Sequence, residues 1–123
     1  MVIAMKNYLE LVPEASTKWT PILNEFKANI REYLWDHNNN KFCPHLYIDG
    51  SPFPDDFNED AIFYHGGTSV AIEAGLLNKE EVKITLTKMI DNINKIGAHS
   101  IGITMYPAYP NGFFKHPILT KAY

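Results

Sequence analysis

Apolar residues recur every three or four positions along much of this chain, a spacing that predicts helices. A short first helix, stopped by Pro13, carries Ile3, Met5, Leu9 and Leu11. A second helix is expected to reach about Trp35, with Ser16 or Thr20 as its cap and Pro21 in its first turn. Its apolar face comprises Trp19, Ile22, Leu23, Phe26, Ile30, Tyr33 and Leu34. These two helices form the first of two expected hairpins.

The second hairpin begins with a short helix capped by Thr68 or Ser69 and ended near Gly75. This third helix carries Val70, Ala71, Ala74 and Leu77. Beyond the hairpin, Ile101 and Ile103 suggest one short strand.

The fourth helix, from about Lys79 to Ile96, has the clearest boundaries. Asn78 and Glu81 have the spacing of a capping box, and Gly97 supplies the left-handed residue that ends a helix. Its expected buried stripe is Val82, Leu86, Met89, Ile90, Ile93 and Ile96.

A long irregular stretch, residues 36–65, separates the two hairpins. Asp and Asn at 36–40 favour a turn, and residues 42–48 are compatible with a short extended segment. A second turn is expected at Asn111 and Gly112. Loops of about thirty residues in a compact domain are usually functional or disordered. The predicted fold class is therefore mainly α: antiparallel helical hairpins with long irregular loops and at most short strands.

Composition limits the classes of function. With 123 residues the chain is expected to form one domain, and 46% hydrophobic residues suffice for a modest core. Eleven basic residues against fourteen acidic ones form no basic stripe, which argues against a nucleic-acid partner. The N-terminus turns polar too early for a signal peptide, and no stretch is apolar enough for a membrane span, so we expect a soluble protein with no membrane partner.

Three segments together resemble a known family. They are Trp35-Asp36 followed by Lys41-Phe42, Ile72-Glu73-Ala74-Gly75-Leu76 followed by Asn78-Lys79-Glu80-Glu81, and Tyr106-Pro107-Ala108-Tyr109-Pro110. Their order and pattern resemble the six-hairpin glycosidases, which are (α/α)6-toroid glycoside hydrolases. The resemblance covers roughly residues 15 to 114 and implies a carbohydrate ligand.

A complete toroid of twelve helices needs on the order of 350 residues at typical helix and loop lengths. Residues 1–123 are therefore expected to be a single helical domain that is a fragment of a larger catalytic domain. Such a piece is expected to form homo-oligomers or to associate with the missing remainder, because a partial ring leaves apolar helix faces uncovered.

Glycoside hydrolysis in its usual form needs two carboxyl groups. Asp55, Asp56 and Glu59 are the candidate catalytic residues, within an acidic cluster that also includes Asp60. Glu73, at the next helix, is a further carboxyl group of interest. The alternative is an acidic loop that only faces water.

Rings and hydroxyls that suit a sugar form the candidate substrate-binding set: His65, Tyr64, Trp35, Tyr106 and Tyr109. His65 precedes two glycines at a helix start, where a ligand can approach closely. Prolines beside the tyrosines would hold their rings in place at low entropic cost. The alternatives are that the rings belong to the core and that His65 is packed or caps a helix.

Other chemistry has weaker support. Cys43-Pro44-His45 offers two potential metal ligands, but no second pair stands at a useful spacing, so we predict no metal and no cofactor. Cys43 as a nucleophile with a histidine base lacks a third residue that would orient the pair.

We therefore expect part of a glycoside hydrolase-like protein that acts on or binds oligosaccharides by carboxylate acid/base chemistry, with enzymatic activity of the isolated piece left open. One alternative is a non-catalytic helical module for carbohydrate binding or self-association. Another is a helical adaptor unrelated to sugars.

Overall fold

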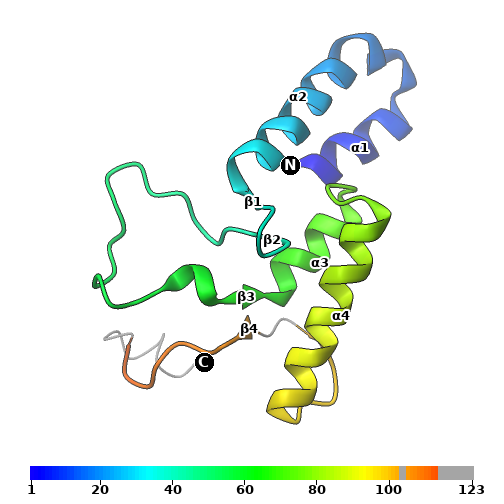
Figure 1. The fold of residues 1–123 in the computed structure, drawn as a ribbon. Helices are drawn as coiled ribbons and strands as arrows, with labels where there is room; N and C mark the ends of the chain where they lie inside the picture. Colours follow the sequence, from blue (N-terminus) through cyan, green and yellow to red (C-terminus); the bar gives the residue numbers. More distant parts are fainter. Residues whose placement is uncertain (103–104, 114–123) are drawn as a thin grey trace.

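The computed structural model describes residues 1–102 and 105–113, which form a mainly α-helical fold (Figure 1). The helices of this described part are α1 (Val2–Leu11), α2 (Ser16–Leu34), α3 (His65–Glu73) and α4 (Lys79–Ile96). Figure 1 shows α1 and α2 side by side with opposite directions, and α3 turning back into α4. The predicted fold class is confirmed at the level of mainly α with few, short strands.

The start of α2 differs from the prediction. Its N-cap is Ala15, which provides no side-chain hydrogen bond, so a cap by Ser16 or Thr20 is wrong. The 3-10 turn Pro13–Ala15 runs directly into the helix, and the Ser16 amide donates to the Pro13 carbonyl. A backbone carbonyl of the turn thus accepts a hydrogen bond from an amide at the start of the helix, as a capping side chain would. Pro21 accordingly lies inside α2, beyond the first turn.

The start of α3 is also earlier than predicted. The helix begins at His65 with Tyr64 as its N-cap and has no side-chain cap. Thr68 and Ser69 instead donate their hydroxyls to the carbonyl oxygens four residues before them, at 2.8 and 3.0 Å. The predicted caps are therefore wrong, because these hydroxyls bond within the helix. Its predicted end is confirmed, with Gly75 at φ +70° just beyond the last turn.

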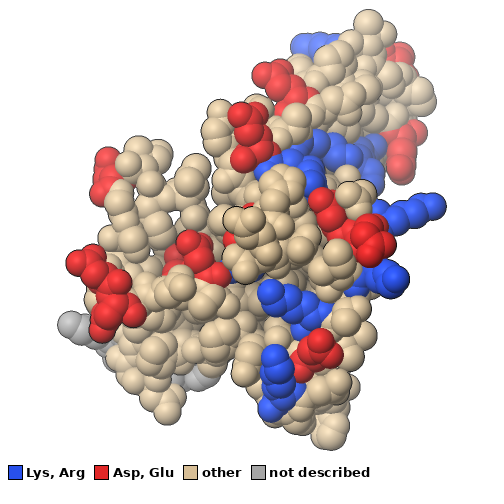
Figure 2. All heavy atoms as spheres, in the orientation of Figure 1, with Lys and Arg blue, Asp and Glu red and all other residues tan. Residues whose placement is uncertain are grey.

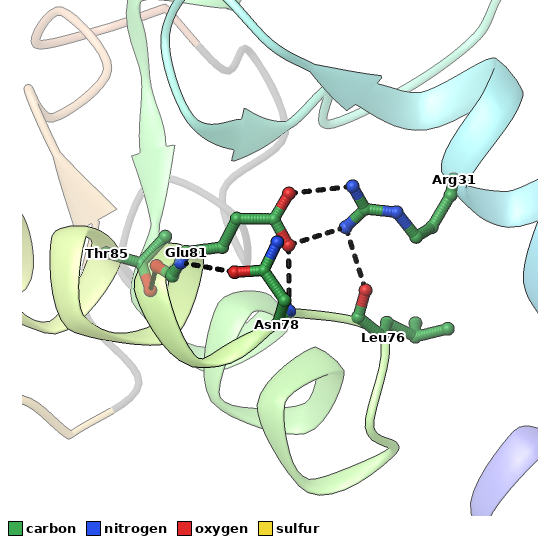
Figure 3. Close-up of polar contacts among 5 residues, drawn as sticks. All are labelled: Arg31, Leu76, Asn78, Glu81 and Thr85. Carbon is green, nitrogen blue, oxygen red and sulfur yellow. Dashed lines mark hydrogen bonds and ion pairs between the residues drawn. The ribbon is translucent and has the colours of Figure 1, made fainter.

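The N-terminus of α4 joins the two hairpins (Figure 3). Both hydrogen bonds of the capping box are present: the Glu81 amide donates to Asn78 Oδ1 at 2.9 Å and the Asn78 amide donates to Glu81 Oε2 at 2.8 Å. Arg31 of α2 forms a bidentate pair with the same carboxylate at 2.7 and 2.9 Å and also donates to the Leu76 carbonyl at 2.8 Å. The predicted cap and the left-handed stop at Gly97, φ +68°, are confirmed.

The buried face of α4 agrees with the predicted stripe only in part. Leu86, Ile90 and Ile96 of the expected stripe are 38%, 51% and 46% exposed, whereas Met89 and Ile93 are buried. The remaining buried positions are the polar residues Thr85 and Asn92. Thr85 tolerates burial because its hydroxyl donates to the Glu81 carbonyl at 2.8 Å. The helix therefore turns a partly polar face inward.

Two short antiparallel ribbons fix the long loop. Strand β1 (Trp35–Asp36) pairs with β2 (Lys41–Phe42), and β3 (Phe63–Tyr64) pairs with β4 (Met105–Tyr106). Of the expected extended segment 42–48, only Phe42 is in a strand. The predicted strand at Ile101 and Ile103 is not observed at Ile101, and Ile103 lies outside the described residues. The β3–β4 pairing brings residues 106–110, which we call the tyrosine-proline segment, to the end of the long loop. The predicted turn after Pro110 is confirmed, since the Phe113 amide donates to the Pro110 carbonyl at 3.0 Å.

The core links the helices. Val2 of α1, Leu23 of α2 and Ala74 after α3 are buried together, with partly buried apolar side chains packed around them. Phe63, Met89 and His65 are nearly inaccessible as well. No helix within the described ranges combines the length and the apolar character that a membrane span requires.

Candidate functional site

The carboxylate of Glu59 is the centre of a polar cluster between the long loop and the tyrosine-proline segment. Glu59 begins the 3-10 turn Glu59–Ala61 and is only 7% exposed. It accepts hydrogen bonds from Tyr47 at 2.8 Å and Tyr109 at 3.0 Å, and its Oε1 lies 2.9 Å from His45 Nδ1. The hydroxyls of Tyr109 and Tyr64 are hydrogen-bonded to each other. We call these five residues the Glu59 cluster.

The phenols of the cluster are held as proton donors. Burial and the hydrogen bond to Glu59 raise the pKa of Tyr47 to about 12. Burial and hydrogen bonds to Tyr64 and Glu59 also raise the pKa of Tyr109. Both hydroxyls therefore remain protonated at neutral pH, as donation to a carboxylate requires.

His45 is the solvent-facing member of the cluster, with a side chain that is 54% exposed. Because Glu59 lies against Nδ1, the neutral ring carries its proton there and presents Nε2 as an acceptor. The Tyr47 ring lies 5.5 Å from the imidazole, centroid to centroid. The cluster thus presents an oriented imidazole to water.

Aromatic rings pack behind the cluster. Phe57 stacks on Tyr109 with centroids 5.4 Å apart and an interplanar angle of 22°, and it lies 4.4 Å from Phe113. Phe53 lies 5.3 Å from both Phe57 and Phe113. This small apolar unit holds the tyrosine-proline segment against the loop.

Lys41 ties the chain beside Glu59 to the β1–β2 ribbon. Its buried ammonium group donates to the carbonyl oxygens of Asp60 and Ile62, the latter at 3.0 Å. Burial lowers the pKa of Lys41. The contacts fix the backbone within and directly after the 3-10 turn.

The structure brings together Glu59, Tyr64 and Tyr109 of the predicted site residues. Asp55 and Asp56 are exposed on the same loop. Figure 2 shows acidic side chains gathered on the left of the molecule, where no basic side chain is visible on the face drawn. Residues 55–60, which we call the acidic loop, therefore border the cluster, and the carboxylate of Glu59 belongs to it.

The other predicted residues lie apart from the cluster. His65 has no exposed surface, its Nε2 lies 3.2 Å from Asn92 Nδ2, and burial lowers its pKa. Trp35 is buried against Phe42, with ring centroids 4.8 Å apart, and its Nε1 has no hydrogen-bond partner among the described residues. Tyr106 is half-buried in β4. In this conformation, neither His65 nor Trp35 offers an accessible surface to a sugar.

His45 and Tyr47 are functional candidates that sequence reasoning did not assign to the carbohydrate site. The sequence suggests His45 only as a potential metal ligand or as a base for Cys43. The signal that was available is the spacing of two residues, which places both side chains on one side of an extended segment. Their common partner is twelve or more residues away and has no local signature.

A cavity of about 470 Å³ has His45 and Tyr64 in its lining. Its walls come from α1, α2, α3 and the segment that follows β2. Cys43 is part of the lining, and burial raises the pKa of its thiol, which favours the unreactive protonated form. A cysteine nucleophile therefore gains no support, although Glu59 does orient the neighbouring imidazole.

Within residues 1–102 and 105–113, no group of three or more His, Cys, Asp or Glu side chains is placed to hold a metal ion. Comparison of the chain with protein-family models finds no match, and searches of curated proteins and of solved structures likewise find none.

Proposed function

We propose that this chain supplies one side of a carbohydrate site in a glycoside hydrolase-like helical protein, with the Glu59 cluster at the centre of that site. The observation that carries the proposal is the hydrogen bond of 3.0 Å between Tyr109 and Glu59. It joins the acidic loop to the tyrosine-proline segment, which resembles a loop on the sugar-facing rim of six-hairpin glycosidases. The arrangement of helices in two consecutive hairpins is compatible with a piece of such a toroid.

The chemistry of the cluster suits a sugar. Saccharide hydroxyls both donate and accept hydrogen bonds, and ligand sites use a few fixed polar groups against apolar walls to orient them. The exposed His45 ring offers an acceptor at Nε2, and the Tyr47 ring lies beside it. The packed rings of Phe57 and Phe113 keep Tyr109 in place without a ligand, which lowers the ordering cost of binding.

The carboxylates divide into two roles on this proposal. Glu59 directs its oxygen atoms at His45, Tyr47 and Tyr109 and so positions these groups. Asp55 and Asp56 stay exposed beside it. Acid/base hydrolysis would use one loop carboxylate together with a second carboxyl group supplied by the rest of the ring.

Sugar binding is the first test. A panel of mono- and disaccharides is titrated into the chain while amide and side-chain NMR shifts are followed, and we expect one class of sugar to shift Tyr109 and His45. Tyr109→Phe keeps the ring but removes the donor, so it is expected to weaken binding about fivefold to tenfold. The control Tyr33→Phe, on the exposed face of α2, should leave affinity unchanged. No sugar bound at millimolar concentration would refute the proposal.

Hydrolysis of nitrophenyl glycosides is the second test. Asp55→Asn, Asp56→Asn and Glu59→Gln are compared in the chain joined to the remaining helices of its domain. Loss of turnover without loss of sugar binding would assign acid/base chemistry to the loop. Unchanged turnover in all three variants would remove the loop from the mechanism.

A second candidate is a non-catalytic helical module that binds sugars or associates with itself. The observation that favours it is the apolar surface left on the helices: Leu11 is 82% exposed, Tyr33 63% and Ile90 51%. Such surfaces commonly become interfaces. Sedimentation should then show dimers or larger species as concentration rises, and sugar binding without turnover would distinguish the module from the enzyme. A clean monomer at high concentration would exclude self-association.

A further inference from the structure

The cavity of about 470 Å³ has a mainly apolar lining, unlike the polar Glu59 cluster. Its volume falls within the range of about 300 to 1,000 Å³ that is typical of small-molecule sites. Phe26 and Ile30 of α2, Val2 of α1 and Ala71 of α3 are among its mainly apolar walls. No Lys, Arg, Asp or Glu belongs to its described lining, although Met1, which carries an amino group, does. An ionised ligand would therefore lose its hydration and gain no counter-charge from a Lys, Arg, Asp or Glu side chain of the walls.

Two polar residues of the cavity lining, His45 and Tyr64, also belong to the Glu59 cluster. Thr68 already donates to the Tyr64 carbonyl, and the Tyr64 hydroxyl is bonded to Tyr109. His45 differs, because its contact with Glu59 uses Nδ1 and leaves Nε2 for a ligand. An acceptor in the lining selects a ligand that has a hydroxyl group to donate.

We propose that this cavity binds a neutral molecule with an apolar body and a hydroxyl group, the body lying between α1, α2 and α3 and the hydroxyl donating to His45. Two sources have this chemistry: a free alkyl or aryl alcohol, and a glycoside with an apolar aglycone whose sugar hydroxyls reach the Glu59 cluster. The glycoside source rests on the proposed function, whereas the alcohol source does not.

Gly67 of α3 provides a variant that fills the cavity. It belongs to the lining, and a Cβ atom built there meets no heavy atom within 4 Å. Gly67→Leu is therefore expected to fold and to occupy space that a ligand needs. Gly67→Ala is the matched control, because it makes the same change to the helix backbone with little added volume. Circular dichroism verifies the fold of both variants.

The experiment titrates 1-hexanol, hexyl β-glucoside, methyl β-glucoside and hexanoate into the full chain at pH 7.5, with amide NMR shifts of Gly67, Ala71 and Ala74 as readout. We expect 1-hexanol and hexyl glucoside to shift these amides and hexanoate to bind at least about tenfold more weakly, because no Lys or Arg side chain of the lining pairs with its carboxylate. Methyl glucoside should leave them unmoved. Gly67→Leu should weaken 1-hexanol binding about tenfold and Gly67→Ala less than twofold. Hexyl methyl ether, which cannot donate to His45, should bind more weakly than 1-hexanol.

The proposal is overturned if 1-hexanol leaves the cavity amides unmoved, if Gly67→Leu binds it as tightly as the parent chain, or if hexanoate binds equally well. It is also overturned if the same amides shift with protein concentration alone and 1-hexanol does not compete, because a second copy would then cover the cavity. Binding of 1-hexanol together with failure of every sugar in the panel would support the cavity and refute the carbohydrate function.

Discussion

The N-terminus of α4 and the Glu59 cluster both centre on a glutamate, but they are built from very different parts of the chain. Glu81 exchanges two hydrogen bonds with Asn78, three residues away, and only Arg31 comes from a distance. Glu59 takes its hydrogen bonds from residues 12, 14 and 50 positions away. The first assembly is largely local, whereas the second exists only once the loop and the tyrosine-proline segment have met.

This difference has consequences for stability and for prediction. A local cap forms with its helix and is added to a structure that exists without it. A cluster of distant residues is part of the connection between its segments, so its loss weakens a contact that, among the described residues, only β3–β4 pairing and the aromatic rings then maintain. We therefore expect the Glu59 cluster to be more sensitive to single substitutions than the α4 cap.

The largest effect is expected for Glu59→Ala. The substitution removes the acceptor of the partly buried hydroxyls of Tyr47 and Tyr109, and the free energy of unfolding should fall by about 3 kcal/mol. Urea denaturation followed by circular dichroism measures the change. Asp56→Ala, an exposed acidic residue of the same loop, is the control and should change stability by less than about 0.5 kcal/mol. Equal effects of the two substitutions would contradict the central role of Glu59.

A smaller loss is expected for Arg31→Met, which tests the one distant contact of the α4 cap. The bidentate pair with Glu81 is partly exposed, with side chains 30% and 13% accessible, so water screens part of its energy. We expect a loss of about 1 to 2 kcal/mol, and Arg31→Lys should restore little because a lysine cannot form the planar pair. Lys83→Met, a cation exposed on α4, is the control. Full rescue by lysine would show that charge alone matters.

Removal of the local cap itself should cost less than removal of Glu59. Asn78→Ala deletes the side-chain acceptor of the Glu81 amide and is expected to lower the free energy of unfolding by about 1 kcal/mol. The matched control is Asn94→Ala on the exposed surface near the other end of α4. If Asn78→Ala destabilised the chain as much as Glu59→Ala, the contrast between local and distant assembly would fail.

The difference between local and distant contacts explains which features of the fold could be predicted from the sequence. The capping box of α4 and the glycine ends of α3 and α4 were predicted because their contacts span a few residues. The caps of α2 and α3 were wrong even though they are local, because a preceding turn and the N-cap Tyr64 define those starts instead. The residue types at the starts of α2 and α3 are compatible with several helix caps, and the surrounding backbone determines which one forms.

Burial and the candidate site depend on distant contacts. The apolar stripe of α4 correctly predicted the burial of Met89 and Ile93, but Leu86 and Ile90 are exposed. Packing within the fold buries the polar residues Thr85 and Asn92 instead. The sequence suggests Glu59 as a candidate catalytic carboxylate and Tyr109 as a candidate sugar-binding residue, and the structure brings the two side chains into contact. The contact of His45 with Glu59 could not be predicted from the sequence, because the two residues are fourteen positions apart along an irregular loop.

The smallest effect is expected from His65, which lies where the long loop enters α3. Burial lowers its pKa in the folded chain below the value of 6.5 that applies to an exposed histidine. Below pH 6.5 the unfolded chain therefore binds a proton that the folded chain does not, so this contribution to stability is complete above pH 6.5 and is lost as the pH falls. Between pH 7 and pH 6 the free energy of unfolding should decrease by at most about 0.7 kcal/mol from this group. His65→Gln is expected to remove that part of the pH dependence while the exposed histidines, present in both chains, contribute equally. Identical pH profiles for the parent chain and His65→Gln would show that burial of this imidazole does not couple protonation to folding.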